Sequence, residues 1–255
     1  MLSKNKIKYL NTLLAKKTRQ KYKNFIAEGD KICTEILNST TVVPLEIYAT
    51  GAWMEKNETR LLTLKGICCE ITESELKKIS QLTTPNQVLI VASQPAFHLE
   101  PNEIDEELVL YLDGIQDPGN MGTILRNADW FGIRYVFCSD NCVDIFNPKV
   151  IQASMGAFLR VKTKEIDLKE LISKNIPVYG AVLGGKNIFT ESLSEKGIIV
   201  IGSEGNGIRA ENLHLVNKPV MIPGATGGAE SLNAAVATGI ICALFKNYTD
   251  NLWTQ

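Results

Sequence analysis

Residues 201–240 restrict the fold and the function of this 255-residue chain more than any other stretch. Three segments there end in or follow glycine-rich and polar turns: IIVIGSEGNG, KPVMIPGATGG and AESLNAAVATGI, the last of which opens a helix. Such turns place bare backbone beside a few polar side chains at the carboxyl edge of a parallel sheet, where α/β proteins hold small polar ligands. The stretch therefore predicts a ligand pocket formed by strand ends.

The spacing of the glycines argues against the common nucleotide sites. Gly202, Gly205 and Gly207 are spaced G-x-x-G-x-G and follow a late strand, whereas the dinucleotide fingerprint G-x-G-x-x-G lies between the first strand and the first helix. The lysine-containing phosphate loop is absent from the sequence as well. Neither a classical dinucleotide site nor an NTPase is supported.

Composition indicates a globular protein with a reducing environment. Apolar residues make up 45% of the chain, and no run of about 18 apolar residues predicts a membrane span. The N-terminal stretch lacks an apolar core before a small-residue cleavage site, so we expect a cytoplasmic protein. Six cysteines without a C-x-x-C pair predict reduced thiols. With His98 and His214 as the only histidines, no metal site is expected.

Basic residues gather at the N-terminus although the net charge is −1. Residues 1–31 contain nine lysines and arginines against Glu28 and Asp30. The nine are Lys4, Lys6, Lys8, Lys16, Lys17, Arg19, Lys21, Lys23 and Lys31. Such a cluster is typical of a polyanion-binding surface, and a solvated helix face explains it equally well.

The pattern of apolar residues predicts two α/β domains separated by a linker. In residues 1–95 the expected elements are a helical stretch over 7–38 with a break near Gly29, strands at 44–50, 67–71 and 87–93, and helices at 53–56 and 73–82. The segment 94–107 has two prolines and five acidic residues without a clear period, and residues 96–107 are predicted to form the linker. In residues 108–255 the expected strands are 109–115, 135–140, 161–166, 177–185, 198–204 and 220–224, and the expected helices are 120–132 with Asn120 as cap, 147–160, 167–175, 209–216 and 231–248. This alternation predicts a doubly wound α/β domain.

Three ordered segments resemble the three motifs of the SpoU/TrmH family, the RNA 2′-O-ribose methyltransferases of the SPOUT class. They are DPGNMGTILRNADWFGI (117–133), IVIGSEGNGI (199–208) and VMIPGATGGAESLNAAVATGI (220–240). The N-terminal segment KKTRQKYKNFIAEGDKICTEIL (16–37) resembles the start of that family's ribosomal-protein-like RNA-binding domain.

The resemblance implies an α/β trefoil-knot (SPOUT) domain at the C-terminus, with S-adenosylmethionine bound in the knot and a homodimer formed through the knot domain. A smaller N-terminal α/β domain would bind RNA. The two-domain layout is more similar to the ribosomal-RNA enzymes than to the compact tRNA enzymes, so ribosomal RNA is favoured over tRNA. No DNA or membrane partner is expected.

The resemblance also implies the site residues. A cofactor held against crossing chains needs close backbone approach, and its adenine needs an apolar slot. The cofactor candidates are Leu183, Ile201, Gly202, Gly205, Ile222, Gly224 and Leu232. The catalytic candidates are Asn120, Arg126, Glu204, Ser231 and Asn233.

The expected roles of the catalytic candidates follow from their chemistry. Arg126 would lie at the reacting hydroxyl, where a guanidinium that keeps its proton orients the ribose or its phosphate and stabilises the developing alkoxide; its role as a base stays open. Glu204 would tie the turn to Arg126 or to backbone amides, while Asn120 would position the turn or the substrate. Ser231 and Asn233 would cap the last helix and line the pocket. Without the resemblance, helix capping alone would explain Asn120, Ser231 and Asn233.

The chain departs from the family pattern at two places and leaves other functions open. The turn 223–228 has glycine where the family usually has methionine and is one residue longer, and Ala235 stands where serine is common. The sequence favours an RNA ribose 2′-O-methyltransferase over a tRNA enzyme, a non-catalytic ribosome-assembly factor or a base-nitrogen methylase. Tyr22, Phe25 and Trp53 are candidates for stacking on RNA bases, with core packing as the alternative.

Overall fold

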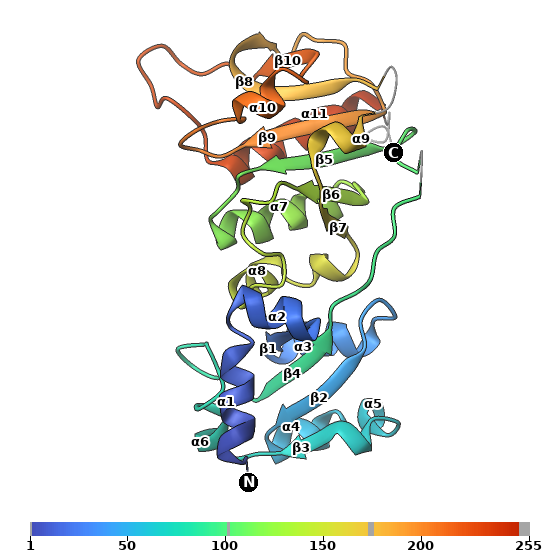
Figure 1. The fold of residues 1–255 in the computed structure, drawn as a ribbon, viewed down its shortest axis with the longest axis vertical. Coiled ribbons are helices and arrows are strands. Elements are labelled where there is room, and N and C mark those ends of the chain that lie inside the picture. Colours follow the sequence, from blue (N-terminus) through green and yellow to red (C-terminus); the bar gives the residue numbers. More distant parts are fainter. Residues whose placement is uncertain (1, 101–102, 173–175, 250–255) are drawn as a thin grey trace. The chain divides into compact units, whose positions relative to one another are not determined.

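The computed structural model describes residues 2–100, 103–172 and 176–249, which form two compact units (Figure 1). The first unit comprises Met1–Ala96 together with Asp144–Leu159. The second comprises Phe97–Val143 together with Arg160–Gln255. Within the described part of the chain, no helix combines the length and the apolar character that a membrane span requires.

The first unit is a four-stranded mixed sheet covered by helices. The strand order is β1-β4-β2-β3, with β4 antiparallel to β1 and β2 and with β2 parallel to β3. The strands are β1 (Asn24–Glu28), β2 (Pro44–Ala49), β3 (Cys68–Glu70) and β4 (Val88–Ser93). The helices are α1 (Lys4–Thr12), α2 (Lys16–Tyr22), α3 (Asp30–Asn38), α4 (Gly51–Lys56), α5 (Glu58–Leu61), α6 (Glu73–Leu76) and α8 (Pro148–Ser154). Leu10 and Leu13 of the first helical segment pack on Ile26 and Leu89 of the sheet to form its core.

Strand β1 lies within residues 7–38, which the sequence predicts to be helical with a break near Gly29. Lys23 adopts a left-handed conformation with φ of 53° and ends α2, and the chain then enters the sheet. Both faces of β1 are buried: Ile26 faces the core with Leu10, and the ring of Phe25 packs on that of Phe146 at 5.1 Å between ring centroids. A short strand that is buried on both faces lacks the alternation by which strands are recognised.

Residues 144–159 follow β6 (Tyr135–Cys138) in the sequence, and in the structure they pack with the first unit. Phe158 joins Phe146 against Phe25, with ring centroids 5.6 Å apart. Asp144 accepts hydrogen bonds from Arg19, whose side chain is almost completely buried. An amphipathic helix carries no signal of which partner its apolar face will cover, so the sequence could not assign this segment.

The second unit is a six-stranded, wholly parallel sheet in the order β10-β8-β9-β5-β6-β7. Its strands are β5 (Leu108–Asp113), β6 (Tyr135–Cys138), β7 (Lys162–Glu165), β8 (Val178–Asn187), β9 (Gly197–Gly202) and β10 (Lys218–Met221). Its helices are α7 (Pro118–Trp130), α9 (Leu168–Leu171), α10 (Ala210–Leu213) and α11 (Ala234–Thr249). The predicted α/β class and the six predicted strands are confirmed.

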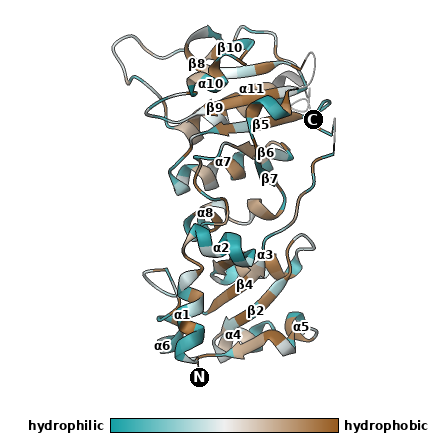
Figure 2. Ribbon diagram, viewed as in Figure 1, coloured by the Kyte–Doolittle hydropathy of each residue, from teal (hydrophilic) through white to brown (hydrophobic). Residues whose placement is uncertain are grey.

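Both faces of the sheet are covered at β5, β6 and β9, which explains why these strands are nearly continuous apolar runs. Alternate residues of β5 and β9, such as Val109 and Val200, share one core cluster with Leu168 of α9. Helix α11 packs against α7 and β9, and its Phe245 meets the ring of Tyr179 edge-on at 4.8 Å. Figure 2 shows the resulting brown, apolar strands in the middle of the unit.

Two helix starts differ from the prediction. Helix α7 begins at Pro118 and is capped by Asp117, whose carboxylate accepts from the backbone N–H of Asn120 at 2.8 Å, so Asn120 is not the cap. Helix α11 begins at Ala234, and Ser231 precedes it. The amide oxygen of Asn233 accepts from the N–H groups of Ala235 and Val236 and caps that helix.

Candidate active site

The carboxyl ends of the central strands bring distant segments of the second unit together. Strands β5 and β9 are neighbours, and their last residues, Asp113 and Gly202, are paired. Since the strands are parallel, the loops that follow them emerge at the same sheet edge. One loop leads to α7 and the other is the turn that carries Glu204.

Three of the predicted catalytic residues form one hydrogen-bonded cluster, Asn120–Glu204–Asn233. The side-chain amide of Asn120 donates to Glu204 Oε1 at 2.6 Å. The amide of Asn233 donates to the same oxygen at 2.9 Å and to Asn120 Oδ1, also at 2.9 Å. The backbone N–H of Ala234 adds a third bond to Glu204 Oε1 at 3.1 Å. In the structure the carboxylate of Glu204 is therefore bound by amide N–H groups and not by Arg126.

The local sequence explains how this cluster can form. Asp117 caps α7 and leaves the amide of Asn120 free to reach Glu204. Asn233 uses its oxygen to cap α11 and its nitrogen to bind the carboxylate. The carboxylate of Glu204 therefore lies at the N-terminus of α11, where the partial positive charge of the helix stabilises an anion.

Arg126 and Ser231 lie outside this cluster. Arg126 is exposed on α7, and no described residue forms an ion pair or hydrogen bond with its guanidinium. Ser231 is exposed in the segment before α11, and its hydroxyl has no partner in the described part of the chain. Both side chains are available to a bound substrate.

Gly202 is required by the turn that follows it. The backbones of Ser203 and Gly207 exchange hydrogen bonds of 3.1 and 2.9 Å, which folds the turn back on the strand end. A Cβ on Gly202 would lie 2.1 Å from the carbonyl carbon of Gly207. By contrast, a Cβ on Gly205 or Gly224 would meet nothing within 4 Å.

The apolar cofactor candidates differ in exposure. Leu183 is 81% exposed and Leu232 is 46% exposed, whereas the Ile201 side chain is 2% exposed and belongs to the sheet core. Only the backbone of Ile201 can contact a ligand. Leu183 lies where the pairing of β8 with β10 is interrupted, and Ile222, directly after β10, is half-buried.

The sequence analysis missed a buried ion pair at the same sheet edge. Asp113 is fully buried at the end of β5 and accepts from the backbone N–H of Arg209 at 2.8 Å and from its Nε at 2.6 Å. Burial opposes the charge of Arg209, but the hydrogen bond and charge of Asp113 leave the pKa of that guanidinium raised. An acidic residue at the end of an apolar run was the signal that could have found it.

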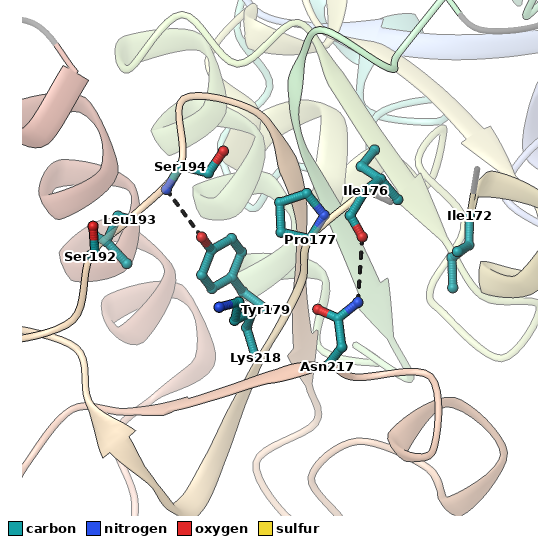
Figure 3. A pocket seen from close by; sticks show the side chains of 9 residues that line it. All are labelled: Ile172, Ile176, Pro177, Tyr179, Ser192, Leu193, Ser194, Asn217 and Lys218. Atoms are coloured by element: carbon teal, nitrogen blue, oxygen red, sulfur yellow. Dashed lines mark hydrogen bonds between the residues drawn. The ribbon is translucent and has the colours of Figure 1, made fainter. Parts of the chain in front are cut away.

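A cavity of about 720 Å³ lies elsewhere in the second unit (Figure 3). Its walls include Pro177 and Tyr179 at the start of β8, and Asn217 and Lys218 at the start of β10. The hydroxyl of Tyr179 accepts from the N–H of Ser194 at 3.0 Å. The amino ends of parallel strands lie at the edge opposite to their carboxyl ends, so this cavity is separate from the Asn120–Glu204–Asn233 cluster.

A metal centre is not indicated by the described residues, where no three His, Cys, Asp or Glu side chains gather as ligands.

The comparisons with known proteins decide the family. The model of the SpoU rRNA Methylase family matches residues 107–243, which is more than half of the chain. The chain belongs to this family. Residues 4–90 of this SpoU methylase match an MRM3-like substrate binding domain.

Similar proteins extend over nearly the whole chain. The 23S rRNA (guanosine(2553)-2′-O)-methyltransferase RlmP of Bacillus subtilis is 32% identical over 244 residues, covering 92% of this chain and 94% of its own. A TrmH-family protein of Porphyromonas gingivalis has a solved structure with a TM-score of 0.82, 38% identity and coverage of 97% and 99%. The AdoMet-bound rRNA methyltransferase of Sinorhizobium meliloti gives a TM-score of 0.86, 25% identity and coverage of 98% and 97%.

Proposed function

We propose that this SpoU methylase transfers a methyl group from S-adenosylmethionine to a ribose 2′-hydroxyl of ribosomal RNA. The observation that carries the proposal is the Asn120–Glu204–Asn233 cluster, in a chain that matches the family over both units and exposes Arg126 on the helix to which Asn120 belongs. The names of its relatives, among them the 23S rRNA 2′-O-methyltransferase RlmP, support ribosomal RNA as the substrate.

The residues at the carboxyl edge of the sheet fit the cofactor. Leu183 and Leu232 expose apolar side chains that would cover an adenine, and Gly205 and Gly224 have open sides that allow close backbone approach. When bound, S-adenosylmethionine supplies a sulfonium methyl group that is already activated for transfer. The protein then has to hold and align the ribose hydroxyl and ease the loss of its proton.

Arg126 is the group that would meet the ribose. A guanidinium carries only hydrogen-bond donors, so Arg126 would donate to the ribose oxygen or the neighbouring phosphate and stabilise developing negative charge. With no partner among the described residues, it needs no rearrangement to accept substrate. Ser231, whose hydroxyl has no partner among the described residues, offers a further polar contact to a substrate.

The Asn120–Glu204–Asn233 cluster positions the two helices that flank the reaction. Glu204 accepts from the first turn of α7 and from the start of α11, and thereby fixes the helix that carries Arg126. Asn127, the neighbour of Arg126, bonds the carbonyl of Ala235 at 2.9 Å and ties the same two helices together. Alignment of this kind is a major part of rate acceleration in two-substrate reactions.

A trefoil knot and a homodimer are part of the proposal. Trp130 of α7 is 84% exposed and Val236 of α11 is 52% exposed, on two helices that pack against each other. Large exposed apolar side chains of this kind support a second copy of the chain as their partner. Light scattering coupled to gel filtration tests this, and a monomer at micromolar concentration would remove the dimer from the proposal.

A cytoplasmic location is also proposed, supported by the free state of the six cysteines.

The enzymatic proposal is tested with labelled S-adenosylmethionine and purified ribosomal RNA or tRNA. We expect 2′-O-methyl label in ribosomal RNA, at a nucleotide that loses its methyl group in a deletion strain. Label in tRNA alone would mean that tRNA, and not ribosomal RNA, is the substrate. No label in either RNA, with a folded protein that binds the cofactor, would overturn the proposed methyl transfer.

A further inference from the structure

The N-terminal basic cluster is reduced by the structure to a defined surface on α1 and α2. Arg19 is buried against Asp144, and Lys6 pairs with Glu46, so neither is available to a polyanion. On these two helices and at the C-cap of α2, the exposed lysines without an acidic partner among the described residues are Lys4, Lys8, Lys17, Lys21 and Lys23, while Lys31, also exposed, lies on α3. Figure 2 shows α2 in teal along its length.

An aromatic side chain lies within this surface. Tyr22 is 47% exposed at the end of α2. Its ring meets that of Tyr9 edge-on, with centroids 5.5 Å apart and an angle of 86°. The hydroxyl of Tyr9 lies 3.0 Å from the side-chain amide of Asn24, which holds Tyr9 in place. Tyr22 is therefore supported on one side and open to solvent on another.

The other aromatic candidates from the sequence are not accessible. Phe25 and Trp53 are fully buried in the first unit, and Trp53 donates its indole N–H to Asp30 at 2.7 Å. Core packing, the alternative considered for all three, is therefore confirmed for these two and not for Tyr22.

The ammonium groups of two lysines lie over the rings of Tyr9 and Tyr22. Lys21 Nζ lies 5.3 Å from the centroid of Tyr22, and Lys6 Nζ lies 5.4 Å from that of Tyr9. A cation over an exposed ring contributes less binding energy than a nucleobase stacked on an aromatic side chain does. A base can thus displace Lys21 from the ring, and the freed ammonium can pair with the adjoining phosphate.

We infer that Tyr22, supported by Tyr9 and flanked by Lys21 and Lys23, is a stacking site for an unpaired RNA base. This inference rests on the proposed function, which supplies RNA as the substrate. A paired base has both faces covered within its helix, whereas bases in loops and single strands can be splayed onto an aromatic ring. The flanking lysines suit the phosphates on either side of such a base.

Variants of Tyr22 test the stacking with the full-length protein. The probe is a fluorescent single-stranded RNA of about 12 nucleotides and mixed sequence, within the site sizes common for such surfaces. Tyr22→Ala and Tyr22→Leu should each raise the dissociation constant about tenfold, because both remove the aromatic face. Tyr22→Phe keeps the ring and should stay within about twofold of the natural protein.

Salt dependence separates the ring from the charges. Lys21→Ala should make the salt dependence of binding shallower, by about 0.7 in the log–log slope for one phosphate contact. Tyr22→Ala should leave that slope unchanged, since it removes no charge. Lys77→Ala, at an exposed lysine of α6's C-terminal end, is the matched control and should change neither affinity nor slope.

The outcomes distinguish this inference from the proposed function. With ribosomal RNA as methyl acceptor, the Tyr22→Ala effect should fall on KM for RNA and leave the cofactor dissociation constant unchanged. Natural affinity in Tyr22→Ala, or full affinity in Tyr22→Leu, would overturn the stacking site while methyl transfer by the natural protein stands. If the natural protein transfers no methyl group, the function fails, and oligonucleotide binding still decides the role of Tyr22.

Discussion

The side-chain nitrogen of Asn233 lies 2.9 Å from the amide oxygen of Asn120, although 113 residues separate the two in sequence. Both amides also donate to the same oxygen of Glu204. Each member of this cluster therefore restrains the other two, so that the starts of α7 and α11 are held by one carboxylate. Coupled networks of this kind respond more strongly to the loss of a shared member than to the loss of one bond.

The first prediction concerns that shared carboxylate. Glu204→Gln removes the charge and should lower kcat/KM for RNA about 10- to 100-fold, since hydrogen bonds to a charged acceptor contribute about 1.5–3 kcal/mol. The change is measured by methyl-transfer kinetics at matched thermal stability. Glu195→Gln, at an exposed glutamate of the same unit, is the control. Equal kcat/KM in both variants would remove Glu204 from the site.

The second prediction concerns Arg126. Arg126→Ala should abolish methyl transfer while the free energy of unfolding changes by no more than about 0.5 kcal/mol, because the side chain is exposed and has no partner among the described residues. Arg126→Lys keeps a charge without the planar fork and should restore only part of the activity. Calorimetry should give an unchanged cofactor affinity for both variants. Normal turnover in Arg126→Ala would exclude the residue from the mechanism.

Strands β5, β6 and β9 of the second unit could be predicted from the sequence because each is an apolar run bounded by turn residues. Strand β1 could not, because Phe25 and Ile26 are buried on opposite faces and give a pattern that a helix also allows. Helix caps were ambiguous for a related reason. Asp117 and Asn120 are both capping residue types, and only the position of Glu204 determines which one is free for the site.

The site residues came from the family resemblance and could not have been joined by local pattern alone. Asn120, Glu204 and Asn233 meet because parallel strands end at one edge, which is a tertiary property. The resemblance carries no information on solvent exposure. It therefore names both Ile201 and Leu183 as cofactor contacts, although the side chain of Ile201 lies in the sheet core. It also passed over Arg209, which binds the buried Asp113.

The third prediction concerns that buried pair. Arg209→Ala leaves the fully buried carboxylate of Asp113 with the backbone N–H at position 209 but without a cation, and should destabilise the protein by about 3 kcal/mol. Asp113→Asn should lower the free energy of unfolding by less, because Arg209 is partly exposed and retains Asp140 and Glu211 as partners. Urea unfolding of the two variants measures the difference. A larger loss for Asp113→Asn than for Arg209→Ala would contradict this assignment.

The fourth prediction concerns the pH dependence of stability. The hydroxyl of Tyr135 donates to Glu103 at 2.7 Å, and together with the Glu100 N–H and Lys162 it lowers the pKa of Glu103 from 4.5 to about 2. A carboxyl whose pKa falls on folding stabilises the protein above its unfolded value, and this contribution disappears as pH falls through the folded value.

The melting temperature of Glu103→Gln should therefore lie below that of the natural protein at pH 6, and the gap should close between about pH 4.5 and 2. Added salt should leave most of the gap, because a hydrogen bond from Tyr135 is the largest cause of the shift. Glu170→Gln, at an exposed glutamate of α9, is the control. A gap that widens toward low pH would have the wrong sign and refute the assignment.

The last prediction separates the two kinds of glycine at the cofactor edge. Gly202→Ala would place a Cβ 2.1 Å from the backbone of Gly207, so the Ser203–Gly207 hydrogen bonds must break and the protein should lose stability before any ligand is added. In Gly205→Ala and Gly224→Ala the added Cβ meets open space, and neither position has a positive φ. The melting temperatures of these two variants should therefore equal that of the natural protein. If these open sides face the cofactor, added S-adenosylmethionine should raise the melting temperature of both variants less than that of the natural protein. An equal rise in all three would mean that the cofactor approaches the backbone elsewhere, leaving Gly202 a requirement of the turn alone.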